Sequence, residues 1–179
     1  MTQLALPITP RDFNRVAVLE GLSLLPRHCD SPAARAMLIA IALQESRLAV
    51  RWQVLQGGGK GPARGLLQFE QGTQASRGGV WGVYLHKTSA SLLAPVCHAR
   101  GVALDPGAIW RALETDDVLA VAVARLLLLT DPYPLPQRGE YDAAWRLYAD
   151  RTWRPGIPHR QTWDAYYDRA WSEVDTEGV

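Results

Sequence analysis

The strongest constraint on the fold is the stretch of residues 33–48, which is apolar around almost its whole circumference when wound as a helix. A helix that is apolar all round belongs in the interior of a protein. Asp30 or Ser31 can cap its start, and Pro32 then falls in the first turn, where proline is well tolerated. The sequence therefore predicts a buried helix over residues 33–48.

A single carboxylate, Glu45, lies near the C-terminal end of this apolar helix. Burial disfavours the charged form of a carboxyl group and so raises its pKa. The negative end of the helix dipole acts in the same direction. A carboxyl group whose pKa approaches neutrality is suited to general acid catalysis. The alternative role for Glu45 is structural, as the partner of Arg47, Arg51 or Arg64.

The rest of the chain also shows a helical pattern. Apolar residues recur at helical spacing in six further segments, residues 11–25, 89–100, 108–113, 116–129, 141–149 and 161–171. Thr115 is the expected cap of the helix over residues 116–129, and residues 68–74 are expected to begin a short helix. The glycine-rich residues 56–61 predict a loop, and no run alternates as a strand does. We therefore expect a mostly α protein with one domain over residues 1–179.

Charge and composition exclude several classes of function. A formal net charge of +1 argues against electrostatic binding of nucleic acid. The most apolar run, residues 118–129, is shorter than a membrane span and contains Arg125, so we expect no membrane insertion. Residues 1–15 lack the features of a secretory signal peptide, so we expect synthesis in the cytoplasm.

The cysteines do not indicate a metal site. Cys29 and Cys97 are far apart in sequence and form no Cys-x-x-Cys pair, although His28 and His98 adjoin them. Two buried free thiols are the favoured interpretation, and a disulfide between them stays open at this point. We expect neither a metal nor another cofactor.

A second motif follows Glu45 and Ser46 after the glycine-rich connection, and it comprises Gly65, Leu66, Leu67 and Gln68. Glu-Ser followed by Gly-Leu-x-Gln resembles the lytic transglycosylases and goose-type lysozymes, which cleave the glycan strands of bacterial peptidoglycan. That family usually has Met where this chain has Leu67, a change that nearly conserves volume. The resemblance is strongest over residues 33–150, within which residues 77–114 look inserted.

The third motif of that family is Ala-Tyr-Asn on a helix, and its Tyr forms a hydrogen bond with the catalytic Glu. Residues 142–150 offer two registers, which place either Trp145 or Tyr148 at the Tyr position. We prefer Tyr148, because its hydroxyl can orient Glu45. Neither register retains the Asn, so the substrate contacts of that residue do not carry over.

The resemblance implies a single lysozyme-like helical domain that acts as a lytic transglycosylase. Glu45 would protonate the β-1,4 glycosidic oxygen between N-acetylmuramic acid (MurNAc) and N-acetylglucosamine (GlcNAc). It would then remove the proton of the muramic C6 hydroxyl, which attacks C1 and forms a 1,6-anhydro ring. The resemblance assigns substrate binding to six further residues, Ser46, Gly65, Leu66, Leu67, Gln68 and Tyr148.

Two alternatives remain. An inverting muramidase needs a second carboxylate, and Glu70, Asp142 and Asp150 are the candidates, with Glu70 foremost because it closely follows the Gly-Leu-Leu-Gln segment. A non-catalytic phage virion or wall-binding protein could keep the same fold. The resemblance, taken with the missing signal peptide, favours a phage particle or a secretion machine as the partner that delivers the chain to periplasmic peptidoglycan. A released endolysin is equally compatible.

The proline-rich segment of residues 151–159 contains Trp153 and is stiff. It either wraps the core or borders the sugar-binding cleft, and wrapping is the favoured interpretation.

Overall fold

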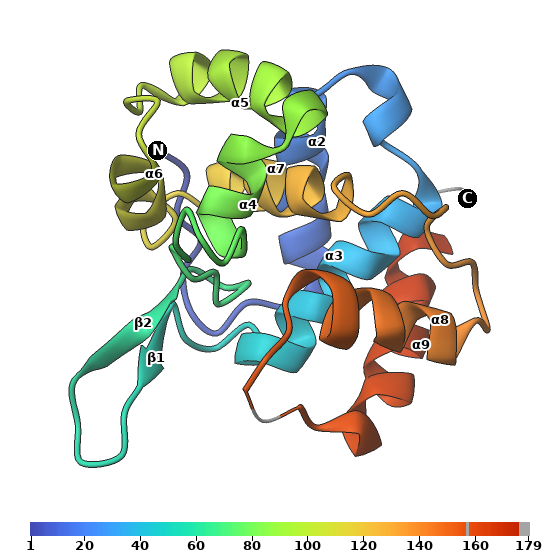
Figure 1. Cartoon of the computed structure of the whole chain (residues 1–179). Helices are drawn as coiled ribbons and strands as arrows, with labels where there is room; N and C mark the ends of the chain where they lie inside the picture. Colours follow the sequence, from blue (N-terminus) through green and yellow to red (C-terminus); the bar gives the residue numbers. More distant parts are fainter. Residues whose placement is uncertain (157, 176–179) are drawn as a thin grey trace.

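The computed structural model describes residues 1–156 and 158–175, and it is mostly helical (Figure 1). The α-helices are α1 (Pro10–Asp12), α2 (Leu19–Ser23), α3 (Pro32–Ser46), α4 (Gly79–Leu85), α5 (Lys87–Arg100), α6 (Pro106–Ala112), α7 (Asp117–Leu128), α8 (Tyr141–Trp145) and α9 (Arg160–Asp175). Other helical turns are η1 (Phe13–Val18) and η3 (Arg146–Thr152), both π-helical, and the 3₁₀ turn η2 (Arg27–Cys29). Two short strands, β1 (Trp52–Val54) and β2 (Lys60–Arg64), complete the described elements.

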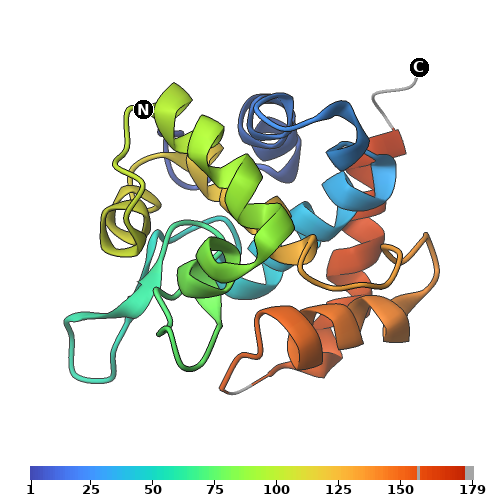
Figure 2. The same cartoon turned by 45° about the horizontal axis from the view of Figure 1, so that its top comes forward.

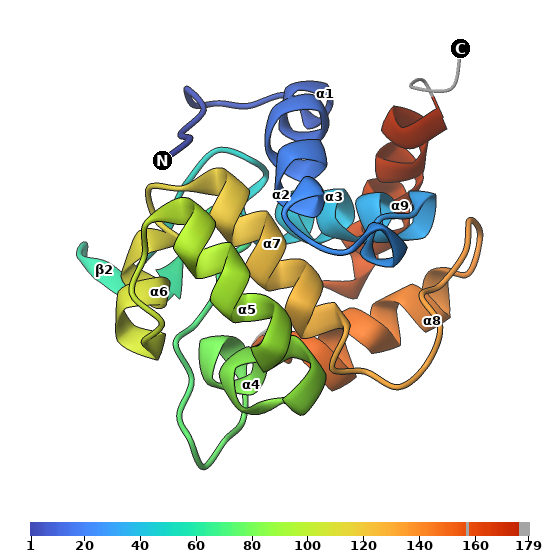
Figure 3. The same ribbon diagram turned by 90° about the horizontal axis from the view of Figure 1, so that it is seen from above.

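Helix α3 lies in the interior, as the sequence predicts. The Ser31 hydroxyl accepts a hydrogen bond from the Ala34 N–H at 3.2 Å, and Pro32 occupies the first turn. The helix ends at Arg47, whose φ of 52° is left-handed. Helix α9 packs along α3, and the continuous helical segment α1–η1–α2 covers another side (Figure 3). The buried side chains form one hydrophobic core that draws on both ends of the chain.

Helix α7 is the second interior helix, and all of its residues are buried. Its cap is Asp116 rather than the expected Thr115, because the Asp116 carboxylate accepts a hydrogen bond from the Leu119 N–H at 3.2 Å. Helices α2 and α5 pack against it (Figure 3). The contact with α2 depends on Gly21, since a Cβ there would lie 2.7 Å from the Val121 side chain. The absence of a side chain at residue 21 thus allows the two helices to approach closely.

The structure corrects the expected secondary structure between α3 and α5. Strands β1 and β2 form an antiparallel hairpin, which projects from the helical body (Figures 1 and 2). Residues 68–74 form no helix, because Gln68 has a φ of 47° and Phe69 pairs with Arg64 in an isolated bridge. Helix α4 was not expected from its glycine-rich sequence.

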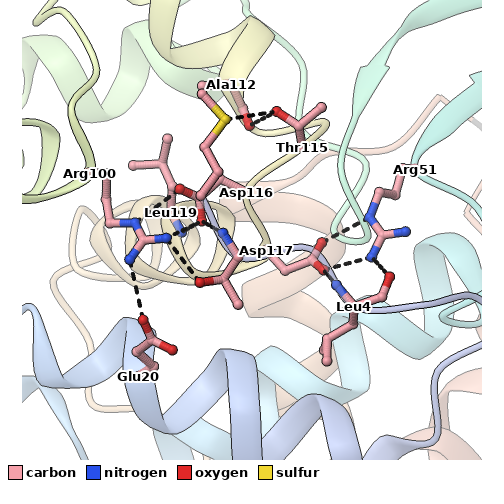
Figure 4. A network of polar contacts seen from close by, with 11 residues as sticks. Leu4, Glu20, Arg51, Arg100, Ala112, Thr115, Asp116, Asp117 and Leu119 are labelled. Carbon is pink, nitrogen blue, oxygen red and sulfur yellow. Dashed lines mark hydrogen bonds and ion pairs between the residues drawn. The ribbon is translucent and has the colours of Figure 1, made fainter.

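A buried polar network joins the start of the chain to the N-terminal end of α7 (Figure 4). Arg51 donates to both carboxylate oxygens of Asp117, at 3.1 and 2.6 Å, and to the Leu4 carbonyl at 2.6 Å. Arg100 binds Asp116 in the same bidentate way, at 2.9 Å for each contact. The network fixes Arg51, which directly precedes β1, and therefore fixes the base of the hairpin.

Cys29 and Cys97 are buried and free, as favoured from the sequence. Across residues 1–156 and 158–175, no three or more His, Cys, Asp or Glu residues gather in a way that could hold a metal ion. In the same described part of the chain, no helix combines the length and apolar character needed to cross a membrane.

Candidate active site

Glu45, in the last turn of α3, faces a cavity of about 660 Å³. Its side chain is partly buried and remains open to the cavity. The hydroxyl of Tyr148, in η3, donates a hydrogen bond to Oε1 of Glu45 at 2.7 Å. The contact between Glu45 and Tyr148 that the sequence predicts is therefore present, across more than a hundred residues of chain.

Burial raises the pKa of Glu45 to about 7. The hydrogen bond from Tyr148 opposes this shift by stabilising the carboxylate, and the negative charge of Glu70 adds to it. Glu45 is therefore in part protonated at neutral pH, and its proton is available to a group bound in the cavity.

The alternative role of Glu45 in an ion pair is not supported. Arg51 is bound to Asp117 at 2.6 Å, and Arg64 is bound to Glu114 at 3.2 Å. Among the described residues, no cationic side chain forms an ion pair with Glu45. A structural carboxylate at this depth would be expected to have such a partner.

Tyr148 is held in place by aromatic neighbours. Its ring stacks on Trp163, with centroids 4.9 Å apart and planes inclined by 7°, and Trp145 meets it edge-on at 5.5 Å. Burial and the nearby Glu45 raise the pKa of the phenol, so that it remains a hydrogen-bond donor at any physiological pH. Tyr148 is only 2% exposed, and it orients Glu45 without reaching the cavity.

Ser46 anchors the Gly-Leu-Leu-Gln segment to the end of α3. Its hydroxyl donates to the Leu66 carbonyl at 2.6 Å and accepts from the Leu48 N–H at 3.1 Å. Gly65 has a φ of 72°, and a Cβ there would lie 2.5 Å from the Leu113 carbonyl oxygen. The segment thus needs glycine at its start and is fixed beside Glu45.

The structure divides the predicted substrate-binding residues into two groups. Of the six residues, Gln68 alone lines the cavity, together with Glu45. The other five are buried and do not line the cavity, namely Ser46, Gly65, Leu66, Leu67 and Tyr148. The side chain of Gln68 is oriented by donation from Nε2 to the Gly65 carbonyl at 2.8 Å.

Besides Phe69 and Leu127, the remaining walls of the cavity come from three segments that the motifs do not indicate. The hairpin contributes Gln53 and Ala63, the loop over residues 70–79 contributes Glu70 and several glycines, and residues 152–156 close the far side. For residues 152–156, the only sequence feature that could have indicated a place in the cavity wall was the proline and tryptophan near residue 153.

Trp153 borders the cavity and also contacts the core, so the favoured wrapping interpretation of residues 151–159 was incomplete. Its Nε1 donates to the Leu67 carbonyl at 2.9 Å, and its ring meets Phe69 edge-on at 5.4 Å. Residue 157 lies outside the described residues.

The structure distinguishes among the three candidates for a second catalytic carboxylate. Glu70 lines the same cavity as Glu45 and is exposed. Asp142 is paired with Arg160 at 2.8 Å, and neither it nor Asp150 lines the cavity. Glu70 is therefore the one candidate of the three that can face a substrate bound at Glu45.

Comparison of the chain with protein-family models, with curated proteins and with solved structures finds no match. The chemistry of the site therefore rests on its own geometry: a carboxyl group with a pKa of about 7, held by a tyrosine, at the wall of an open cavity.

Proposed function

We propose that this chain is a peptidoglycan lytic transglycosylase with a lysozyme-like fold, which cleaves the β-1,4 bond from MurNAc to GlcNAc. The observation that carries the proposal is the Glu45 carboxyl group, whose pKa is raised to about 7 at the cavity wall and which is oriented by Tyr148. The resemblance of Glu45-Ser46 and residues 65–68 to that family supplies the substrate class.

In the proposed reaction, protonated Glu45 gives its proton to the glycosidic oxygen as the bond to C1 of MurNAc breaks. The Glu45 carboxylate then takes the proton of the C6 hydroxyl as O6 attacks C1. The 1,6-anhydro ring closes without water, and Glu45 is returned to its protonated form. Attack within one sugar residue gains from the proximity of its reacting atoms. The hydrogen bond from Tyr148 supports the carboxylate stage of this cycle.

An inverting muramidase is the second candidate, and the position of Glu70 favours it. Glu70 lies in the wall of the same cavity and is close enough to raise the pKa of Glu45. In that mechanism Glu70 would activate a water molecule on the opposite face of the sugar. A non-catalytic wall-binding or virion protein is the third candidate, and the raised pKa of Glu45 counts against it, because binding alone does not need it.

We further propose that the protein works as a phage virion or secretion-machine component that reaches periplasmic peptidoglycan. This context rests on the family resemblance.

Clearing of purified peptidoglycan by the wild-type protein, Glu45→Gln and Glu70→Gln tests these alternatives. Glu45→Gln is expected to lose about 10²–10⁴-fold in rate, because an amide of nearly equal shape cannot donate the proton. Glu70→Gln should retain most activity in a transglycosylase and lose it in an inverting muramidase. Thermal unfolding of each variant controls for folding. Retention of most activity by a folded Glu45→Gln protein would overturn the proposal.

A further inference from the structure

Arg154 is the one cationic side chain among the described residues that line the cavity. Two carboxylates, Glu45 and Glu70, line it as well, and yet Arg154 pairs with neither of them. The pKa of Glu45 responds to burial, Tyr148 and Glu70. The guanidinium thus keeps its five N–H donors free for a ligand in the cavity.

The backbone at Arg154 is of a kind that usually carries glycine. Its φ of 48° is left-handed, and it follows the end of η3, where glycine or asparagine is the common residue. The N–H groups of Trp153 and Arg154 both donate to the Tyr148 carbonyl, at 2.9 and 3.3 Å. Because the Tyr148 hydroxyl binds Glu45, one helix end fixes both Arg154 and the proposed acid. A long side chain at such a strained backbone position is therefore a candidate for a functional role.

The guanidinium group lies against Gly78 on the neighbouring wall. A Cβ at Gly78 would lie 3.0 Å from Nη2 of Arg154. The loop that carries Gly78 is itself tightly fixed, since a Cβ at Gly72 would lie 2.1 Å from the Gly78 carbonyl oxygen. The space occupied by the guanidinium therefore depends on a residue without a side chain in a firmly held loop.

The substrate class of the proposed function contains one kind of group that a free guanidinium binds well. The sugar rings are neutral, whereas the lactyl arm of muramic acid ends in a carboxylate or is joined to a peptide that carries carboxylates. A planar guanidinium binds a carboxylate through two parallel charge-assisted hydrogen bonds.

We propose that Arg154 is a substrate-specificity residue that binds a carboxylate carried on the lactyl arm of muramic acid, either that of the arm itself or one of the attached peptide. The proposal rests on the proposed function for its substrate class. It implies that the cavity distinguishes peptidoglycan from chitin, whose sugars have no lactyl arm.

Binding measurements in a Glu45→Gln background test this proposal without depending on catalysis. The probes are a GlcNAc–MurNAc disaccharide bearing a tetrapeptide, the same disaccharide with a free lactyl carboxylate, and chitohexaose. Affinities are measured by calorimetry with and without Arg154→Gln. Arg146→Gln is the matched control, because Arg146 is exposed, loses the same charge and does not line the cavity. Arg154→Gly tests the same loss with a residue that suits the left-handed backbone, so that misfolding does not confuse the result.

We expect Arg154→Gln and Arg154→Gly to weaken binding of at least one of the two charged probes about tenfold or more, as loss of a charge-assisted hydrogen-bond pair does. Chitohexaose affinity and the Arg146→Gln control should not change. A loss confined to the peptide-free disaccharide identifies the lactyl carboxylate as the ligand, because that group is an amide in the peptide-bearing probe. A loss confined to the peptide-bearing probe identifies a carboxylate of the peptide, and a loss with both probes shows that the guanidinium binds either one. Equal weakening of chitohexaose, no weakening of either charged probe, or no binding by the parent protein would overturn the assignment.

The same experiment separates this proposal from the proposed function. If the wild-type protein cleaves peptidoglycan and Arg154→Gln binds every probe normally, the proposed function stands and the carboxylate site is refuted. If the wild-type protein shows no cleavage and the charged probes still bind through Arg154, the carboxylate site stands and the enzymatic proposal is refuted.

Discussion

Replacing Glu45 with Gln is expected to stabilise the protein at alkaline pH, although it removes the proposed catalytic acid. Burial raises the pKa of Glu45 in the folded protein to about 7, from an ordinary value of 4.5. A carboxyl group whose pKa rises on folding contributes stability that is complete below the unfolded pKa and is lost as the pH rises through the folded pKa. The wild-type protein therefore loses this stability between pH 4.5 and about 7, whereas the uncharged Gln does not.

The expected size of the effect follows from the same two pKa values. At about 1.4 kcal/mol per pKa unit, the interval from 4.5 to about 7 corresponds to about 3 kcal/mol. The free energy of unfolding of Glu45→Gln, relative to wild type, should therefore increase by about 3 kcal/mol between roughly pH 4 and pH 8. Titrating groups that do not interact with Glu45 act equally on both proteins and cancel in this difference.

Urea unfolding of both proteins across this pH range measures the effect. Glu70→Gln is the matched control, because Glu70 lines the same cavity but is exposed, and its substitution should give a much smaller pH-dependent difference. A stability difference between wild type and Glu45→Gln that is constant with pH, or that moves in favour of wild type at alkaline pH, would refute the argument that Glu45 is held in its neutral form by burial.

Three further predictions concern the supports of the site. Tyr148→Phe removes the hydrogen bond that lowers the pKa of Glu45, so the alkaline limb of the pH–rate profile should move to higher pH. The maximal rate should fall about tenfold or more. The control Trp145→Phe should lower the thermal midpoint without moving that limb. Gly65→Ala should destabilise the protein by about 2 kcal/mol or more in urea unfolding, because of its positive φ and the close carbonyl, and a neutral result would show that the segment can relax. Arg51→Met leaves the buried Asp117 carboxylate unpaired and should lower the free energy of unfolding by about 3–5 kcal/mol, which a thermal midpoint equal to that of wild type would contradict.

The sequence is informative about this fold where its pattern is strong and local. The seven segments predicted from helical pattern are helical, whereas the short helix expected at residues 68–74 is absent. Of the two caps that the sequence offers for α3, Ser31 is the one used, and Pro32 lies in the first turn. The cap of α7 was assigned one residue too early, since Thr115 and Asp116 both have a side-chain oxygen and only the fold decides which one meets the Leu119 N–H.

The missed elements are those whose burial depends on tertiary structure. All three residues of β1 are exposed. Burial does alternate along β2, but its inward residues are Gly61 and Ala63, which give no strong apolar signal in the sequence. Helix α4 contains two glycines, and it is fixed by the burial of Val80 and Val83. Neither burial pattern is visible before the chain is folded.

The candidate site also has a part that the sequence predicts and a part that depends on the fold. Glu45 and Tyr148 were found from an apolar helix and a motif, and they meet in the structure. The motifs alone do not distinguish residues that line the cavity from buried residues behind its wall, such as Ser46 and Leu66, which form a hydrogen bond with each other. Arg154 carries no sequence signal, because its place in the cavity wall depends on a glycine in a distant loop.

The products released from purified peptidoglycan test the central claim most directly. Digestion in water labelled with heavy oxygen, followed by mass spectrometry of the muropeptides, distinguishes internal attack by O6 from attack by water. We predict 1,6-anhydro-muramic ends without incorporated label from the wild-type protein, and none from Glu45→Gln. Labelled reducing ends would identify a muramidase instead, and the absence of any muropeptide product would contradict an enzymatic role for Glu45.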